Sequence, residues 1–387
     1  MRKHHTIIEM QFSQVAGQQK VKEKLINAVK GGRIPHAQLY YGPEGCGNLP
    51  LAIAYAQYIA CLNRGEDDSC GTCSSCVKFA KLAHPDLHFS FPFNATKRIN
   101  KALDKIVSDE FIAEWREKVL QTPYFTEKDW YLHIGIENKQ GIIGKSEGDN
   151  IARKLQYKSY ESEYKYMIIW LPEYMNTRAA NSLLKLVEEP PSKTIFLFVS
   201  DNVNEVLPTI FSRTQPIKLN PIDNESLAAS INKTGTADKT IIDSIVKIAS
   251  GNYIKALQLM DQSEQTAAFL GRFKDMMRLA WKRDMASILS WIDELNTTGR
   301  EQIKNFLEYA LHMIRENFMM HTNNEGVMHM TQNENEFSAN FNKFINGRNV
   351  IPLTRELTTA YNDVSRNGNT KIILTDTVLK VARLLRK

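Results

Sequence analysis

The stretch HAQLYYGPEGCGNLPLAIAYAQYIAC (His36–Cys61) decides how the rest of the chain is interpreted. Its apolar start predicts a short strand over residues 38–41, its glycines predict a loop over residues 42–47, and a helix is expected from about Leu49. A phosphate-binding loop requires this strand–loop–helix order, because backbone N–H groups and a helix N-terminus cradle the phosphate. The stretch therefore indicates the scaffold of a nucleotide-binding fold.

The loop itself lacks the groups that act on nucleotide. Gly42, Gly45 and Gly47 provide the glycines of the pattern, but Asn48 and Leu49 follow where the pattern requires Lys and then Ser or Thr. Lysine contacts the outer phosphates and the hydroxyl binds magnesium, so hydrolysis needs both. These five residues are interpreted as a degenerate phosphate loop, and no functional ATP site is expected.

The acidic residues that bind magnesium in a nucleotide hydrolase are also missing further along the chain. Residues 166–170 predict a buried strand, which in a nucleotide hydrolase of this architecture ends in acidic residues that hold magnesium. Here Trp170 and Leu171 occupy those positions, and Glu173 comes too late in register to replace them. We therefore expect the isolated chain not to be an enzyme.

Composition indicates a globular protein. The length of 387 residues predicts two or three domains, and 43% hydrophobic with 24% charged residues is typical of globular chains. No apolar run approaches the roughly 20 residues of a membrane helix, and the N-terminus lacks the apolar region of a signal peptide. We expect a cytoplasmic protein without membrane contact. The net charge of +6 permits a nucleic-acid role without demonstrating one.

Four of the five cysteines cluster as Cys61, Cys70, Cys73 and Cys76. This spacing is suited to a structural zinc site with four thiolate ligands. Four unrelated cysteines and a redox C-x-x-C pair are the alternatives, but the clustering disfavours the first and the absence of a following βαβ pattern disfavours the second. Cys46, in the glycine loop, is interpreted as a small packing residue.

Three regions follow from the pattern of strands and helices. Alternating strands and helices predict a parallel α/β domain over residues 1–220 that contains the cysteine module, residues 61–76. Residues 221–264 are expected to form a small helical lid of about three short helices. Residues 265–387 are expected to form an all-α domain, with a loop over residues 321–336 and helices over residues 267–281, 286–295, 300–320, 355–364 and 375–385.

Several motifs together resemble one family. They are HAQLYYGPEGCG (36–47), the four-cysteine module, HPDLHF (84–89), NSLLKLVEEPP (181–191) and LPTIFSRTQ (207–215), with a weaker match in YNDVSRNGNTKIIL (361–374). In this order they resemble the clamp-loader subunits of bacterial DNA polymerase III, which belong to the AAA+ class. The resemblance covers about the first 220 residues and implies an AAA+ α/β domain, a helical lid and a helical collar domain for oligomerisation.

The resemblance also assigns roles to particular residues. The phosphate loop lacks its Lys and its Ser or Thr, and the strand over residues 166–170 lacks its magnesium acids. Together with Ile254 at the position of a nucleotide-sensing arginine, these absences match the ATPase-inactive type of subunit. Arg213 lies within Ser-Arg-Thr, where the family has Ser-Arg-Cys, so that Thr214 replaces the cysteine. The resemblance implies that Arg213 acts in trans on the ATP of a neighbouring subunit. The implied partners are the ATP-hydrolysing subunits, the clamp-opening subunit and, through the complex, the sliding clamp and primed DNA.

Two rival functions stay open at this point. An active AAA+ ATPase would bind nucleotide as an isolated chain, and a zinc-containing nucleic-acid-binding module would bind DNA tightly and in a salt-dependent manner. Asn48 argues against the first, and the lack of a basic stripe with interleaved aromatic residues argues against the second. Residues 94–138 are longer than the corresponding segment usually is in the family, and the sequence gives them no function.

Overall fold

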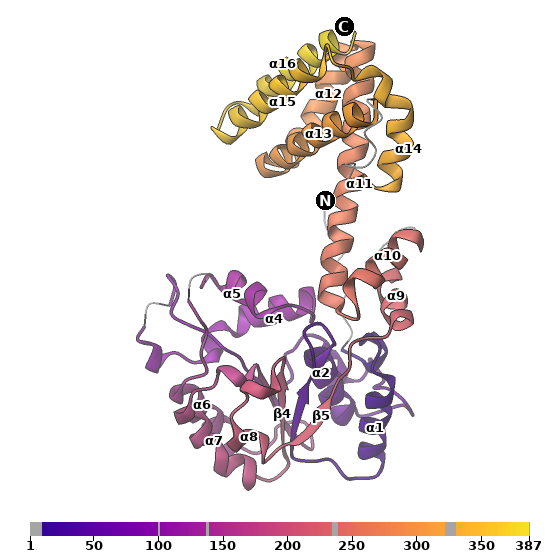
Figure 1. Cartoon of the computed structure of the whole chain (residues 1–387). Coiled ribbons are helices and arrows are strands. Elements are labelled where there is room, and N and C mark those ends of the chain that lie inside the picture. The colour runs from indigo at the N-terminus through magenta and orange to yellow at the C-terminus, as the bar shows by residue number, and fades with distance from the viewer. Residues whose placement is uncertain (1–9, 100, 137–138, 234–238, 322–329, 387) are drawn as a thin grey trace. The chain divides into compact units, whose positions relative to one another are not determined.

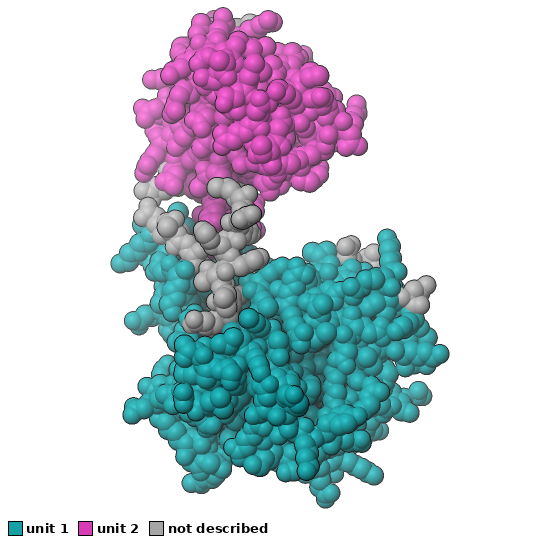
Figure 2. All heavy atoms as spheres, turned by 180° about the vertical axis from the view of Figure 1, so that it is seen from behind, with its two compact units in different colours: residues 1–259 teal, residues 260–387 magenta. Residues whose placement is uncertain are grey.

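The computed structural model describes residues 10–99, 101–136, 139–233, 239–321 and 330–386 (Figure 1). The chain divides into two compact units, residues 1–259 and residues 260–387 (Figure 2). Among the described residues, no helix is both long and apolar enough to span a bilayer.

A parallel five-stranded sheet forms the centre of the first unit, with the strand order β2-β3-β4-β1-β5 among the described residues. The strands are β1 (Ala37–Tyr41), β2 (Leu87–Ser90), β3 (Lys165–Trp170), β4 (Thr194–Ser200) and β5 (Gln215–Lys218). Every residue of β3 and β4 is buried, as expected for parallel strands covered on both faces. The predicted parallel α/β fold with an all-α C-terminal part is confirmed.

The first unit also contains α-helices and short 3-10 helices. The α-helices are α1 (Gln19–Lys30), α2 (Asn48–Ala60), α3 (Ser74–Ala80), α4 (Ile112–Gln121), α5 (Glu127–Ile134), α6 (Lys145–Gln156), α7 (Thr177–Glu188), α8 (Pro208–Phe211), α9 (Asn224–Asn232) and α10 (Lys239–Ala249). The short 3-10 helices are η1 (Phe12–Gln14), η2 (Leu103–Lys105), η3 (Ser108–Phe111), η4 (Pro172–Tyr174) and η5 (Val203–Glu205).

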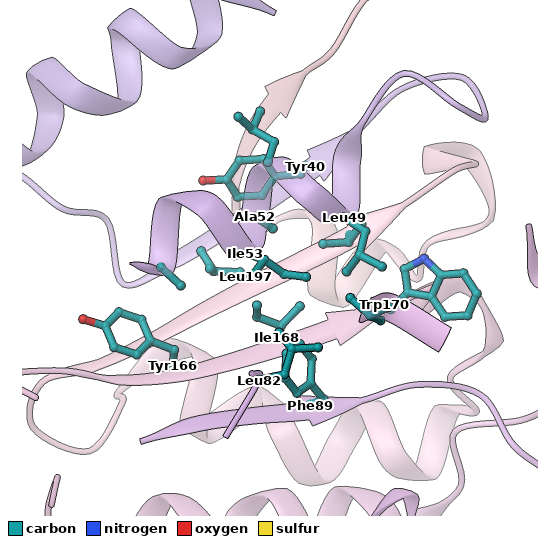
Figure 3. Close-up of a cluster of buried hydrophobic side chains, with 14 of the residues drawn as sticks. Tyr40, Leu49, Ala52, Ile53, Leu82, Phe89, Tyr166, Ile168, Trp170 and Leu197 are labelled. Atoms are coloured by element: carbon teal, nitrogen blue, oxygen red, sulfur yellow. The ribbon is translucent and has the colours of Figure 1, made fainter. Parts of the chain in front are cut away.

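Each face of the sheet has its own apolar layer. On one face, α2 packs against the strands, and all of its residues are buried. Figure 3 shows this layer, in which Tyr40, Ile168 and Leu197 of the sheet meet Ala52 and Ile53 of α2. On the other face, α6 and α7 cover the alternate strand residues. The alanine-rich sequence of α2 thus follows from its position between apolar layers.

The segment between β2 and α6 adds a helical insert, defined here as residues 103–134 (η2, η3, α4 and α5). Trp115 lies at its centre, with ring centroids 4.3 Å from Phe91 and 5.2 Å from both Trp130 and Trp170. For this segment the sequence predicts one amphipathic helix around Trp115, followed by aromatic loops. The helix is confirmed as α4, but the prediction of loops is wrong, because α5 follows.

A buried carboxylate ties this insert to the sheet domain. Both the backbone N–H and the hydroxyl of Ser108, in η3, donate to the Glu147 carboxylate of α6, at 2.8 and 2.6 Å. Burial raises the pKa of Glu147, while the bonds from Ser108 oppose that rise. The insert is therefore held by a specific polar contact as well as by apolar packing.

Helices alone form the second unit among its described residues. They are α11 (Tyr253–Lys282), which begins in the first unit, α12 (Met285–Asn296), α13 (Arg300–His321), α14 (Gln332–Phe341), the 3-10 helix η7 (Asn342–Phe344), α15 (Val350–Ser365) and α16 (Thr370–Leu384). Their buried faces form one apolar core that includes Phe273, Phe306 and Leu353.

Two expectations about this part of the chain are wrong. The helix expected to begin at residue 267 is part of a longer one, because α11 is a single helix of 30 residues. Residues 261–266 (DQSEQT) are polar but contain neither Gly nor Pro to interrupt it. The loop expected over residues 321–336 gives way to α14 from Gln332, while residues 322–329 lie outside the described part of the chain.

Candidate functional site

The glycine loop joins β1 to α2, as the sequence predicts. Gly45 and Gly47 have φ angles of +77° and +96°, which side chains rarely tolerate, so glycine is required at both positions. A β-carbon at Gly45 would lie 2.0 Å from Oδ1 of Asn252, and the Gly45 carbonyl accepts the N–H of Tyr253 at 3.1 Å. The loop is thus in direct contact with the start of α11.

The Asn48 side chain is directed at the end of the neighbouring strand β4. Its amide donates to the Ser200 carbonyl at 2.8 Å and to the Asp201 carboxylate at 2.9 Å. The Cys46 thiol donates to Oδ1 of Asn48 at 2.5 Å. Asn48 therefore fastens the loop to the sheet, at the position where a phosphate loop carries its lysine.

The end of β3 is apolar. Trp170 is 3% exposed, and its ring lies 5.2 Å from Trp115 and 5.1 Å from Phe125 of the helical insert. Figure 3 shows Trp170 at the end of its strand, on the same side of the layer as Leu49. Leu171 follows with a φ of 55° and is also buried. Neither residue carries a carboxylate, the group that binds magnesium in a nucleotide hydrolase.

Carboxylates nevertheless gather beside the loop. Oε1 of Glu173 accepts the backbone N–H groups of Asp201 and Asn202 at 3.1 and 3.2 Å. Burial, together with the nearby carboxylates of Glu173, Glu44 and Glu127, raises the pKa of Asp201 to about 7. The surroundings of Asn48 are consequently acidic, which disfavours a phosphate group.

The four clustered cysteines meet where α2 ends and α3 begins. Their sulfur atoms all lie within 4.8 Å of one another, and the sulfur of Cys61 is 3.5 Å from that of Cys70 and 4.0 Å from that of Cys73. A tetrahedral ion with bonds of about 2.3 Å to sulfur places its ligands about 3.8 Å apart. The cluster therefore fits a metal ion of that size.

Backbone groups around the cluster favour thiolates. The N–H of Cys70 donates to the sulfur of Cys61, that of Cys73 to Cys70 and that of Cys76 to Cys73, at 3.3, 3.3 and 3.5 Å. Such bonds stabilise negative charge on sulfur, which a metal ligand needs. The loop between α2 and α3 also holds the N-terminal segment around η1, because the Asp68 carboxylate accepts the N–H groups of Phe12 and Ser13.

Arg213 follows α8 on the surface of the same unit. Its Nε donates to Oε1 of Glu188 at 2.5 Å, and its Nη1 donates to the Thr209 carbonyl at 3.0 Å. These two bonds hold the guanidinium in place. The side chain is 32% exposed, so it still faces solvent. It does not line the cavity at the glycine loop.

The structure gathers most of the predicted loop residues around one small cavity. Gly45, Gly47, Asn48, Leu49, Trp170 and Ile254 line it together. The cysteine cluster lies at the opposite end of α2, about 20 Å away for a helix of this length. Sequence reasoning missed Tyr124 and Asp201, because each contacts the loop region from a distant segment and belongs to no motif. It also missed Asn252, which lies two residues before Ile254 and contacts Gly45 from the start of α11.

Comparison with protein families gives one assignment. The family model described as "DNA polymerase III, delta subunit" matches residues 17–223, more than half of the chain. The match includes the sheet, the glycine loop, the cysteine cluster and Arg213.

Individual proteins agree with this assignment. The chain is 26% identical to the DNA polymerase III subunit gamma/tau of Mycobacterium bovis, over 65% of this chain and 36% of that protein. It is 27% identical to the subunit delta' of Bacillus subtilis, over 54% of this chain and 50% of that protein. The match to the subunit delta' of Pseudomonas aeruginosa is 29% identical, over 47% and 43%. The chain thus matches half or less of the length of these relatives.

Among solved structures, a DNA polymerase III gamma subunit-related protein from Thermotoga maritima aligns over 94% of this chain and 99% of its own. The sequence identity is 13% and the TM-score is 0.36.

Proposed function

Since the chain belongs to the DNA polymerase III, delta subunit family, we propose that it is a non-catalytic, delta-prime-type subunit of a bacterial clamp loader. It would assemble in the cytoplasm with ATP-hydrolysing subunits and a clamp-opening subunit. The complex would place a sliding clamp on primed DNA.

The state of the glycine loop carries the non-catalytic part of this proposal. Asn48 is bound to the end of β4, and Leu49 is a buried apolar residue, so neither supplies a cation or a magnesium ligand. Trp170 stands in the aromatic core where a magnesium acid is needed. Hydrolysis of ATP depends on all of these groups, so their combined loss supports a structural role.

The second part of the proposal is that Arg213 acts in trans on a neighbouring subunit. Arg213 is partly exposed and oriented by Glu188 and by the Thr209 carbonyl, which supports its action on the ATP of a neighbouring subunit. A guanidinium directed at the γ-phosphate stabilises the charge that develops during phosphoryl transfer.

A structural zinc ion is the third part. Four thiolates complete a tetrahedral shell and leave no open position for substrate, so the ion would stabilise the fold without taking part in catalysis. Cys61, Cys70, Cys73 and Cys76 would hold it.

The domain roles complete the proposal. Residues 1–220 would form the AAA+ domain with the zinc module inserted, residues 221–264 the lid, and residues 265–387 the collar that joins the subunits. This division follows from the resemblance to clamp-loader subunits.

The proposal is tested by purifying the tagged protein from its source and identifying the proteins that accompany it. We expect the other loader subunits and the clamp. Purification of the protein without them would contradict the proposal. Salt-dependent DNA binding by the isolated chain would then favour a nucleic-acid-binding zinc protein.

A further inference from the structure

The helical insert sends one side chain into the centre of the degenerate nucleotide site. Tyr124 follows α4 and is 7% exposed, and its hydroxyl accepts the backbone N–H of Ala16 at 2.9 Å. A β-carbon built on Gly47 would lie 3.3 Å from the same hydroxyl. The ring packs edge-on against Tyr253, with the centroids 4.5 Å apart. Tyr124 thus contacts the N-terminal segment, the glycine loop and the start of α11 at once.

Little space remains beside it. The cavity lined by Gly47, Asn48, Phe125 and Trp170 has a volume of about 20 Å³. A single water molecule needs about 10–15 Å³, whereas small-molecule pockets are typically about 300–1,000 Å³. With the insert in this position, the cavity does not enclose a nucleoside triphosphate.

Two carbonyl groups of the loop are bonded to distant parts of the chain. The Gly45 carbonyl accepts from the N–H of Tyr253, and Oδ1 of Asn252 lies 2.0 Å from the position that a β-carbon at Gly45 would take. The Cys46 carbonyl accepts from the side chain of Gln18 at 3.0 Å. These bonds hold the loop through its carbonyl groups and require no ligand.

We propose that the helical insert acts as a permanent internal occupant of this site, with Tyr124 replacing a nucleotide as the link between the N-terminal segment, the glycine loop and α11. The loop and the start of α11 then keep one arrangement without any ligand. The proposal assigns a function to the described residues of the segment 94–138. It concerns the isolated chain, so it stands independently of the proposed place in a clamp loader.

Tyr124→Ala and Tyr131→Ala form a matched pair for the test. Tyr131 belongs to the same insert and is also 7% exposed, but it packs against Gly141 and away from the glycine loop. Amide hydrogen exchange of the full-length protein is measured for each variant and for the unmutated chain, together with the melting temperature in the presence and absence of millimolar Mg²⁺–ATP.

We expect Tyr124→Ala to speed exchange by at least about tenfold in three places: near Ala16, over residues 45–49 and over residues 253–256. Tyr131→Ala lowers the stability of the whole protein, and that loss is first subtracted from the exchange data. After this correction, the three segments in Tyr131→Ala should exchange at close to the unmutated rate. ATP should not change the melting temperature of the unmutated protein, because a ligand that binds the folded state would raise it.

Two results would overturn the proposal. The first is a rise in melting temperature, or slower exchange over residues 45–49, when ATP is added to the unmutated protein. The second is the same exchange pattern for both alanine variants. If Tyr124→Ala does not fold, Tyr124→Phe removes only the hydrogen bond to Ala16 and should speed exchange of that amide by about threefold to tenfold. An unchanged rate there would equally contradict the proposal.

Discussion

Asp201 is a residue whose ionisation is opposed by its position. Burial and neighbouring carboxylates raise its pKa from 3.8 to about 7, so between about pH 4 and pH 7 the folded state holds a proton that the unfolded state has released. The contribution of this group to stability is therefore complete below about pH 4 and is lost as the pH rises through 7.

Replacement of Asp201 by Asn removes this penalty while keeping an oxygen that can accept from Asn48. We expect Asp201→Asn to raise the free energy of unfolding at pH 8 by on the order of 1–3 kcal/mol, with a much smaller gain at pH 5. Urea unfolding at the two pH values measures both differences. An equal effect at pH 5 and pH 8 would show that the Asp201 carboxyl ionises normally in the folded protein.

Arg213 should matter for catalysis in the assembly and little for the folding of the chain. Its ion pair with Glu188 is partly exposed, so Arg213→Ala should cost less than about 1 kcal/mol of stability. In a reconstituted loader, the same variant should lower ATP hydrolysis stimulated by DNA and clamp. The loss should be partial, because other active sites would keep their own arginine.

Two controls separate these roles. Arg213→Lys keeps a positive charge without the planar, two-pronged group, so it should recover little of the rate. Glu188→Gln breaks the ion pair but keeps the arginine, so it should retain most of the activity. An Arg213→Ala complex that assembles and hydrolyses ATP at the unmutated rate would leave Arg213 as a surface charge.

At the scale of elements, the cysteine module connects α2, α3 and the N-terminal segment. Replacement of Cys73 by Ser should lower zinc content and melting temperature together, because metal binding contributes directly to folding. It should also speed amide exchange at Phe12 and Ser13, which are bound by Asp68 of the same loop.

Cys46→Ser is the matched control, since Cys46 is a buried cysteine outside the cluster. It should keep its zinc. Metal analysis of protein purified without chelator provides the measurement, with one zinc per chain expected for the unmutated protein. A content far below one would remove the basis for a structural metal site.

Local signals in the sequence account for much of the fold. The strand, glycine loop and helix from residue 37 to residue 60 could be predicted, because an apolar run, required glycines and an alanine-rich stretch are adjacent. Two helices that were not predicted, α5 and α14, begin with a capping signal that was present in the sequence. Thr126 is the N-cap residue of α5, and the carboxylate of Asp129, three residues later, accepts its backbone N–H. Thr331 is the N-cap residue of α14, and the carboxylate of Glu334 accepts its backbone N–H in the same way.

The interior of the site could not be predicted in this way. Tyr124 reaches Ala16 across 108 positions of sequence, and Asn48 reaches Asp201 across 153. Neither contact leaves a local pattern, because each depends on how the sheet and the insert are assembled. The position of Trp170 at the end of a buried strand was visible in the sequence, but its packing on Trp115 was not.

At the scale of the whole molecule, the isolated full-length chain should not hydrolyse ATP. Asn48→Lys should not create activity, because the new ammonium group would face Asp201 and the Ser200 carbonyl and the end of β3 would still lack carboxylates. Phosphate release by the purified chain and by the variant measures this. Turnover that persists through successive purification steps, in proportion to the protein, would contradict the expectation.

The strand order β2-β3-β4-β1-β5 also determines when the protein can fold during synthesis. β1 is made first, yet its two neighbours are β4 and β5, which end only at residue 218. At roughly 5–20 residues per second, the ribosome needs on the order of 10–30 s to pass from α2 to the end of β5. Throughout that interval the apolar α2 has no complete sheet to cover it, so the nascent chain should depend on chaperone binding until its last strand emerges.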